Sequence, residues 1–259
     1  MASNTPQLWD KLWINPISIE EDLFKLAQEE HTIRWQRMEH IILREFRTFE
    51  GLRVIEIGAG AGTNAALMAK RGAQVTILDY SDAALKRAQE FFTRNGLTAT
   101  MLCQNALALP PEILGQFDIA MSFGLTEHFR GDARVKINKA HFDLVRPGGL
   151  VFISVPNQFN PPYRIFKFTA ELVGAWHVGE EYPYSRGELR HICKQIGIRD
   201  YGFFGDNFFW SLNFVSPLKI IRKIFKIKPN LSIARLKKEK GTWLDQFFAY
   251  ALILYGKKE

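Results

Sequence analysis

The feature that most constrains this chain is the pattern of residues 51–156, where short apolar runs alternate with amphipathic helical runs. This alternation is typical of an α/β fold with a parallel sheet, because each buried strand is followed by a helix that covers one face. We expect Ser81 to cap the second of the helices and the Pro-Gly-Gly turn at 147–149 to stop the third. The predicted strands are 52–57, 74–78, 98–103, 117–123 and 150–155, and the predicted helices are 63–71, 82–95 and 134–145.

The pattern changes after Pro156. Residues 157–183 are rich in aromatic side chains, and the adjacent Pro161 and Pro162 predict that regular structure is absent there. A helix is predicted over 185–197, with Ser185 and Glu188 as a capping box. Two apolar strands, 201–209 and 247–255, are predicted on either side of a basic stretch, and two helices, 19–31 and 32–49, precede the core.

Length and composition are those of one elaborated globular domain over residues 1–259, since 47% of the residues are hydrophobic and 24% are charged. We expect an N-terminal helical lid (1–50), a ligand-binding core (51–156) and two cap insertions (157–184 and 210–245). The chain has no apolar run long enough to span a bilayer and no secretory signal pattern. Its two cysteines, 103 and 193, have no metal-ligand spacing, so the sequence predicts a cytoplasmic protein without a metal site.

Positive charge is concentrated in one segment. Residues 215–241 carry nine lysines and arginines and one acid, Glu239. Within it, 216–228 places apolar residues at helical spacing opposite cations, which predicts a basic amphipathic helix. Such a helix can lie on an anionic membrane surface, or it can pack on the domain with its lysines in water. Nucleic acid is not an expected partner, because the charge is confined to this segment.

A glycine-rich turn follows the first predicted strand. Gly58, Gly60 and Gly62 would let a ligand approach the backbone at a helix N-terminus. The dinucleotide fingerprint needs its third glycine one position later, where this chain has Thr63. Glu56, at the tip of the strand, would repel a diphosphate and suits a ligand with a cationic amino group.

The second predicted strand ends in Asp79, about 20 residues beyond the first glycine. A carboxylate at this place can accept hydrogen bonds from both hydroxyls of a ribose. A ligand with a ribose, an amino group and no diphosphate is S-adenosylmethionine.

These features, in register with two further segments, resemble the class I S-adenosylmethionine-dependent methyltransferases that act on small molecules. The further segments are FDIAMSFGLTEHF at 117–129 and LVRPGGLVFI at 144–153. The resemblance covers roughly residues 51–200. It implies a Rossmann-like, doubly wound, seven-stranded sheet that is mostly parallel with an antiparallel last strand, together with N-terminal helices and helical, aromatic cap insertions.

The resemblance also implies where S-adenosylmethionine binds. The glycine turn, including Ala59, would lie beneath the methionine part, with Glu56 near its amino group, Asp79 on the ribose and Tyr80 against the adenine. Asn105 stands where the family usually has an acid, and its carbonyl oxygen can still accept from the adenine amine. The remaining expected cofactor contacts are Ala106, Phe123 and two lid residues, Trp9 and Trp13.

Methyl transfer from a sulfonium is an in-line displacement, so the protein chiefly positions the reactants and excludes water. The aromatic residues outside the sheet favour a small apolar or aromatic acceptor, methylated at oxygen with the help of a general base. His128 and His177 are the candidates, although His128 can equally shape its loop. Two other functions stay open, a non-catalytic binding or scaffold protein and a membrane-associated lipid or quinone methyltransferase.

Overall fold

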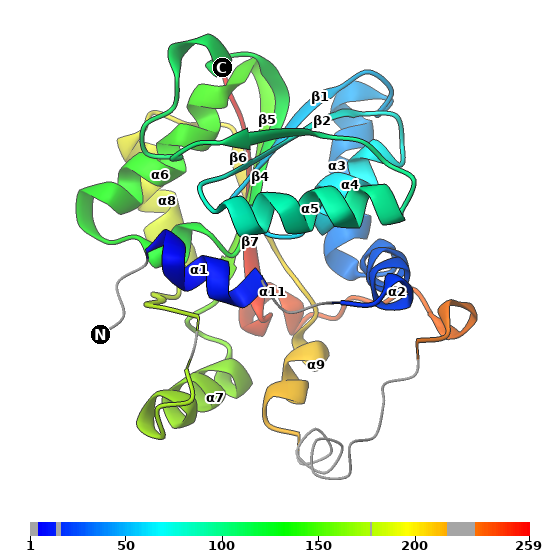
Figure 1. The fold of residues 1–259 in the computed structure, drawn as a ribbon. Coiled ribbons are helices and arrows are strands. Elements are labelled where there is room, and N and C mark those ends of the chain that lie inside the picture. The colour runs from blue at the N-terminus through cyan, green and yellow to red at the C-terminus, as the bar shows by residue number, and fades with distance from the viewer. Residues whose placement is uncertain (1–4, 14–16, 177, 217–230) are drawn as a thin grey trace.

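The computed structural model describes residues 5–13, 17–176, 178–216 and 231–259. Its centre is a seven-stranded sheet of order β3-β2-β1-β4-β5-β7-β6, in which only β7 runs antiparallel to its neighbours (Figure 1). This confirms the predicted fold class. The strands are β1 (Arg53–Ile57), β2 (Gln74–Asp79), β3 (Thr100–Cys103), β4 (Phe117–Phe123), β5 (Val145–Pro156), β6 (Tyr201–Gly205) and β7 (Ala251–Lys257).

Helices cover both faces of the sheet, because successive side chains of each strand point to opposite sides. In β1, Val54 packs with the helices of one face, whereas Ile55 and Ile57 pack with those of the other. The first face carries α2 (Ile19–Glu30), α3 (Ile33–Phe46), α4 (Thr63–Ala69) and α5 (Asp82–Arg94). The second carries α6 (Gly131–Leu144) and α8 (Arg186–Gln195).

The remaining helices lie beyond the carboxyl ends of the parallel strands, where ligands bind in open α/β sheets (Figure 1). They are α1 (Pro6–Trp13), α7 (Pro161–Leu172), α9 (Phe208–Ser211), α11 (Asp245–Phe248) and the short 3-10 helices η2 (Thr126–His128), η3 (Leu212–Phe214) and η4 (Ile233–Arg235). A further 3-10 helix, η1 (Pro111–Ile113), precedes β4.

The prediction that the proline pair forbids regular structure was wrong. Pro161 and Pro162 are the first residues of α7, where the missing N–H groups would have no helical partner in any case. Asn160 caps the helix by accepting from the Tyr163 N–H at 2.8 Å. The prolines therefore start the helix and do not interrupt it.

The largest of the other differences from the predicted boundaries are in β5, β6 and β7. β5 begins at Val145 and runs through 147–149, with a register shift opposite Phe117 and Ile119 that accommodates the turn residues. β6 ends at Gly205, because Asn207 caps α9 by accepting from the Trp210 N–H. β7 begins at Ala251, and Phe247 and Phe248 of the predicted strand belong to α11 instead.

The predicted caps are present in part. Ser81 accepts from the Ala84 N–H at the start of α5, as expected. Ser185 accepts from the Glu188 N–H, but the Glu188 carboxylate pairs with Arg134 at 2.9 Å, so the capping box at α8 is half formed. The predicted basic helix at 216–228, except for its first residue, and the candidate base His177 lie outside the described residues. No helix in the described part of the chain is both long and apolar enough to cross a membrane.

Candidate active site

The turn between β1 and α4 is built from glycines in the left-handed region. Gly58, Gly60 and Gly62 have φ angles of 59°, 54° and 68°. A Cβ on Gly60 would come within 2.3 Å of the Trp13 ring, and one on Gly58 within 2.6 Å of Leu125. Only glycine lets these side chains, or a ligand in their place, approach the backbone so closely.

Glu56 lies beneath this turn, on the face of β1 that carries α4. Its carboxylate accepts from the Ala65 N–H at 2.8 Å, so it ties the strand to the first turn of the helix. The side chain is 3% exposed, and burial raises its pKa to about 8. A cation beside the Glu56 carboxyl group would stabilise its ionised form, because opposite charges attract.

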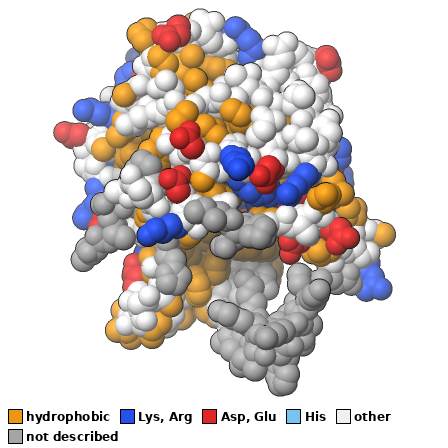
Figure 2. All heavy atoms as spheres, viewed as in Figure 1, with side chains coloured by type: hydrophobic (Ala, Val, Ile, Leu, Met, Phe, Trp, Pro, Cys, Tyr) orange, Lys and Arg blue, Asp and Glu red, His pale blue; other side chains and the backbone are white. Residues whose placement is uncertain are grey.

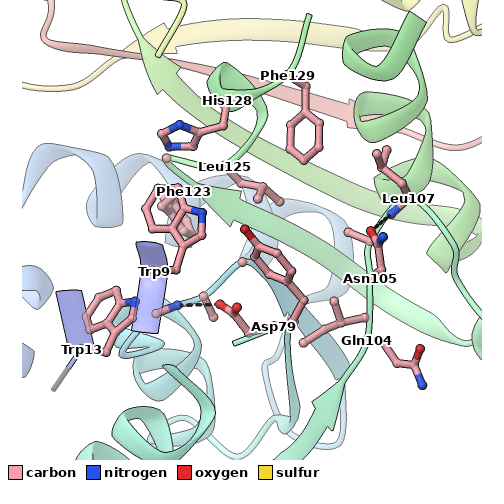
Figure 3. A pocket seen from close by; sticks show the side chains of 17 residues that line it. Trp9, Trp13, Asp79, Gln104, Asn105, Leu107, Phe123, Leu125, His128 and Phe129 are labelled. Atoms are coloured by element: carbon pink, nitrogen blue, oxygen red, sulfur yellow. Dashed lines mark hydrogen bonds between the residues drawn. The ribbon is translucent and has the colours of Figure 1, made fainter. Parts of the chain in front are cut away.

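Asp79 closes the other side of the turn. One carboxylate oxygen accepts from the Ser81 N–H at 3.0 Å. The other accepts from the Gly60 N–H at 3.4 Å (Figure 3). Burial raises its pKa, and these backbone hydrogen bonds oppose the rise. The side chain is thus held rigidly at the tip of β2 and faces the same space as the glycines.

A cavity of about 360 Å³ opens between these elements (Figure 3), in the range of small-molecule sites. It brings together most of the residues that the sequence singled out; Glu56 and Gly62 are near it but do not line it. The predicted residues in its wall are Trp9, Trp13, Gly58, Ala59, Gly60, Asp79, Tyr80, Asn105, Ala106, Phe123 and His128.

One end of the cavity is formed by Tyr80 and the loop after β3. The Tyr80 hydroxyl has its pKa raised to about 12 by burial and accepts a hydrogen bond from the Trp9 side chain. The Asn105 carbonyl oxygen accepts from the Leu107 N–H at 2.9 Å, so one of its two lone pairs is already used. The second lone pair of this oxygen remains available to a ligand.

Helix α1 covers the cavity and contributes Trp9 and Trp13 to its wall. Asp10 accepts a hydrogen bond from the Ser81 hydroxyl at 2.5 Å, which docks the helix on the start of α5. On the opposite side Trp9 meets the His128 ring edge-on, with 4.7 Å between ring centroids. The helix therefore spans the cavity from the Asp79 side to the His128 side.

The far end of the cavity is formed by Phe123 and the turn that carries His128. The His128 Nδ1 lies 2.7 Å from the carbonyl oxygen of Glu180; because a carbonyl only accepts, Nδ1 carries the proton. Burial lowers the pKa of His128, partly offset by the backbone of Glu180 and Gly124, so the ring is neutral at pH 7. The Tyr182 N–H donates to the Glu127 carbonyl at 2.8 Å, which holds the same turn from the cap side.

Arg34 is a residue of this region that the sequence did not reveal. Its guanidinium lies 5.2 Å from the centre of the Phe123 ring and is held by Glu29, at 2.7 Å, and Asp206, at 3.3 Å. Its partners come from α2 and from the loop after β6, so no local pattern could have found it. With Trp210 and Tyr250 it lines a second, smaller cavity of about 160 Å³.

Comparison with known proteins decides the family. A model of the methyltransferase domain matches residues 54–149. The ubiquinone biosynthesis O-methyltransferase of Stutzerimonas stutzeri is 35% identical over 175 residues, which cover 67% of this chain and 70% of that protein. The chain belongs to the class I S-adenosylmethionine-dependent methyltransferases. The cofactor of this family is S-adenosylmethionine.

Other similar proteins agree with this assignment. The ubiquinone biosynthesis O-methyltransferase of Leptothrix cholodnii is 33% identical over 159 residues, 58% of this chain and 65% of that protein, so this match spans less than two thirds of the relative. Magnesium protoporphyrin IX methyltransferase from Synechocystis PCC 6803, solved with S-adenosylhomocysteine, has a TM-score of 0.56 and 14% identity. The match covers 98% of the present chain and 93% of the Synechocystis chain, which shows that the two proteins have the same fold.

Proposed function

We propose that this methyltransferase transfers the methyl group of S-adenosylmethionine to an oxygen atom of a small apolar or aromatic acceptor. The observation that carries the proposal is the cavity itself, which has rigid polar groups at its Asp79 end and aromatic rings at its His128 end. The names of the relatives, ubiquinone biosynthesis O-methyltransferases, support oxygen as the atom that is methylated.

The residues present fit the cofactor. The glycine turn admits the methionine part, Asp79 accepts from the ribose hydroxyls, and the Tyr80 and Asn105 walls take the adenine. When bound, S-adenosylmethionine supplies an activated methyl group on a sulfonium. The chain's own residues orient it, and α1 excludes water by lying across the cavity from Ser81 to His128.

Glu56→Gln is expected to weaken the binding of S-adenosylhomocysteine about tenfold while making the ligand-free protein more stable at pH 8. The affinity falls because a neutral amide attracts the ligand's ammonium group less than a carboxylate does. The folded chain keeps the Glu56 proton up to a pKa of about 8, whereas the usual pKa of a glutamate is 4.5. Stability of the wild type therefore falls as the pH rises through that window, and glutamine removes the fall.

Calorimetry gives the affinity, and thermal unfolding at pH 5 and pH 8 gives the stability. The control is Glu90→Gln, on the exposed face of α5, which should change neither. An unchanged affinity in Glu56→Gln would show that this carboxylate does not contact the ligand's charge and only ties β1 to α4.

Asp10→Ala is expected to speed the dissociation of S-adenosylhomocysteine by about threefold to tenfold. The substitution removes the hydrogen bond that docks α1 on Ser81, which is worth about 1 kcal/mol. Ser81 still caps α5, so the core is unaffected. Stopped-flow tryptophan fluorescence measures the rate, and Lys11→Ala, an exposed change on the same helix, is the control. Equal rates in all three proteins would contradict a closing role for α1.

The acceptor is expected to enter from the cap side, where Phe123 and Phe129 line the cavity. Aromatic walls of this kind select a flat or apolar acceptor, because such a molecule gains both burial and ring contacts.

A methyl-transfer assay with radiolabelled S-adenosylmethionine tests the proposal. Alkylphenols, alkylamines and alkyl carboxylic acids of matched chain length are compared as acceptors. Turnover of the phenols is expected. Turnover of the amines alone would contradict oxygen as the methylated atom, and tight cofactor binding without turnover of any acceptor would favour a binding protein.

A further inference from the structure

The turn that carries His128 is held in place by a segment of the cap. Residues 178–184, between α7 and α8, form no helix and lie against η2. The Tyr182 N–H donates to the Glu127 carbonyl at 2.8 Å, and the His128 Nδ1 donates to the Glu180 carbonyl at 2.7 Å. We call residues 178–184 the cap segment. The position of the His128 ring therefore depends on how firmly the cap segment rests on η2.

Glu127 contributes a buried carboxyl group to this contact. Its side chain is 3% exposed, and its Oε2 atom has no hydrogen-bond partner among the described residues. Its Oε1 atom would lie 3.3 Å from a Cβ on Gly124, a residue that lines the cofactor cavity. The carboxyl group is thus just behind the cavity wall. A buried polar group without a partner costs free energy, so it calls for a functional explanation.

The cation that faces Glu127 from α6 is engaged elsewhere. This cation is Arg134, whose guanidinium pairs with Glu188 at 2.9 Å and lies 3.4 Å from the centre of the Tyr184 ring. The acid that faces Glu127 from the cap segment is Glu181. Burial, and after it the Glu181 carboxyl, raises the pKa of Glu127 well above its usual range. The other titratable groups around Glu127 are uncharged hydroxyls, those of Tyr163, Tyr184 and Tyr250.

Glu181 is better placed than Glu127 to carry a negative charge. It faces α7, whose outer end projects from the domain (Figure 2), whereas Tyr163 and Lys167 of the same helix are only 1% and 6% exposed. The Tyr163 hydroxyl donates to the Glu181 carboxylate, and Lys167 faces it while pairing with Glu171. Burial raises the pKa of Glu181, but these two neighbours oppose the rise. Of the two acids, Glu127 is therefore the one that holds a proton.

We propose that Glu127 is a positioning residue that acts as a neutral acid, which lets the cap segment rest on η2 and orient the His128 ring in the cavity. With Glu127 ionised, two buried carboxylates would repel each other across this contact. The cap segment would then move away from η2, and the His128 Nδ1 would lose the Glu180 carbonyl. The inference rests on the proposed function, in which the His128 ring faces the acceptor.

The contact between the cap segment and η2 is expected to weaken as the pH rises. The folded chain binds the Glu127 proton more tightly than the unfolded chain does. The stability that this proton provides is therefore fully present at low pH and is lost as the pH rises through the raised pKa of Glu127. Activity would then be limited by His128 on the acid side and by Glu127 on the alkaline side.

Hydrogen exchange at the Tyr182 amide tests the inference on the full chain, because this N–H is protected by the Glu127 carbonyl. After correction for the intrinsic exchange rate, protection in the wild type should fall about tenfold or more between pH 6.5 and pH 9, the effect of one pKa unit of repulsion. Glu127→Gln has the shape of the neutral acid and should keep its protection at pH 9. The control is Glu112→Gln, the same change at an exposed position of η1, which should behave like the wild type.

Glu181→Gln is a second variant that removes the repulsion from the other side of the contact. Its amide oxygen can still accept from the Tyr163 hydroxyl, so the cap segment keeps its link to α7 and the Tyr182 amide should stay protected at pH 9. Protection that is independent of pH in the wild type would overturn the inference. An equal fall in the wild type and in both glutamine variants would overturn it as well.

Turnover separates a positioning role from a purely structural one. With an alkylphenol as acceptor, kcat of the wild type should fall at alkaline pH. Glu127→Gln should extend the active range to higher pH and leave the KM for S-adenosylmethionine unchanged. The same alkaline fall in Glu127→Gln and the wild type would contradict the positioning role. Because hydrogen exchange does not use turnover, a protein with the expected exchange that methylates no phenol contradicts only the proposed function.

Discussion

Asp79→Ala is expected to weaken the binding of S-adenosylhomocysteine by about 100-fold or more, the largest effect on affinity in this chain. Two hydrogen bonds from ribose hydroxyls to a charged acceptor are lost, each worth about 1.5–3 kcal/mol. The effect is large because the carboxylate is 6% exposed and fixed by the Ser81 and Gly60 N–H groups, so it is oriented before the ligand arrives.

Asp79→Asn keeps one carbonyl oxygen and should recover part of the affinity. Asp82→Asn, three residues on and exposed at the start of α5, should bind like the wild type. Calorimetry measures all three, and thermal unfolding confirms that each is folded. Wild-type affinity in Asp79→Ala would place the ribose somewhere other than at the tip of β2.

His128→Ala and His128→Gln are each expected to lower kcat by about 100-fold or more, if His128 accepts the proton of the acceptor hydroxyl. Burial holds the pKa of His128 below its usual value of 6.5, so the ring is in the basic form at neutral pH. In the wild type kcat should fall on the acid side as the ring becomes protonated, and this acid limb should disappear in the variants.

Glutamine separates the two roles that the sequence left open for His128. Its amide N–H can still donate to the Glu180 carbonyl and hold the turn, but glutamine cannot accept a proton at neutral pH. Near wild-type kcat with an unchanged pH profile in His128→Gln would show that the ring shapes the loop. His40→Gln, exposed on α3, is the control for a change of histidine count.

The arrangement of the glycine turn and Asp79 around one cavity could be predicted from sequence because its signals are local. Gly58, Gly60 and Gly62 stand together in one turn, and Asp79 stands at the end of the next strand. In a parallel sheet the ends of adjacent strands meet at one edge, as β1 and β2 do here. A sequence pattern of about 25 residues therefore predicts that the glycine turn and Asp79 lie side by side.

The cap could not be predicted in the same way, because its structure depends on single caps and on distant partners. A proline pair breaks a helix in its interior but is accepted in its first turn. Here Asn160 caps the helix, so the prolines fall in the first turn. The apolar run after Tyr201 stops being a strand where Asp245, far along the chain, accepts from the Phe208 N–H at 2.8 Å. Arg34 gains its place over Phe123 from the same kind of long-range contact.

A crystal structure with S-adenosylhomocysteine tests the central claim most directly. We predict the ligand in the cavity under α1, with its ribose hydroxyls on Asp79, its amino group toward Glu56 and its sulfur facing Phe123 and His128. A ligand bound elsewhere, or one that leaves Asp79 without a ribose contact, would contradict the account.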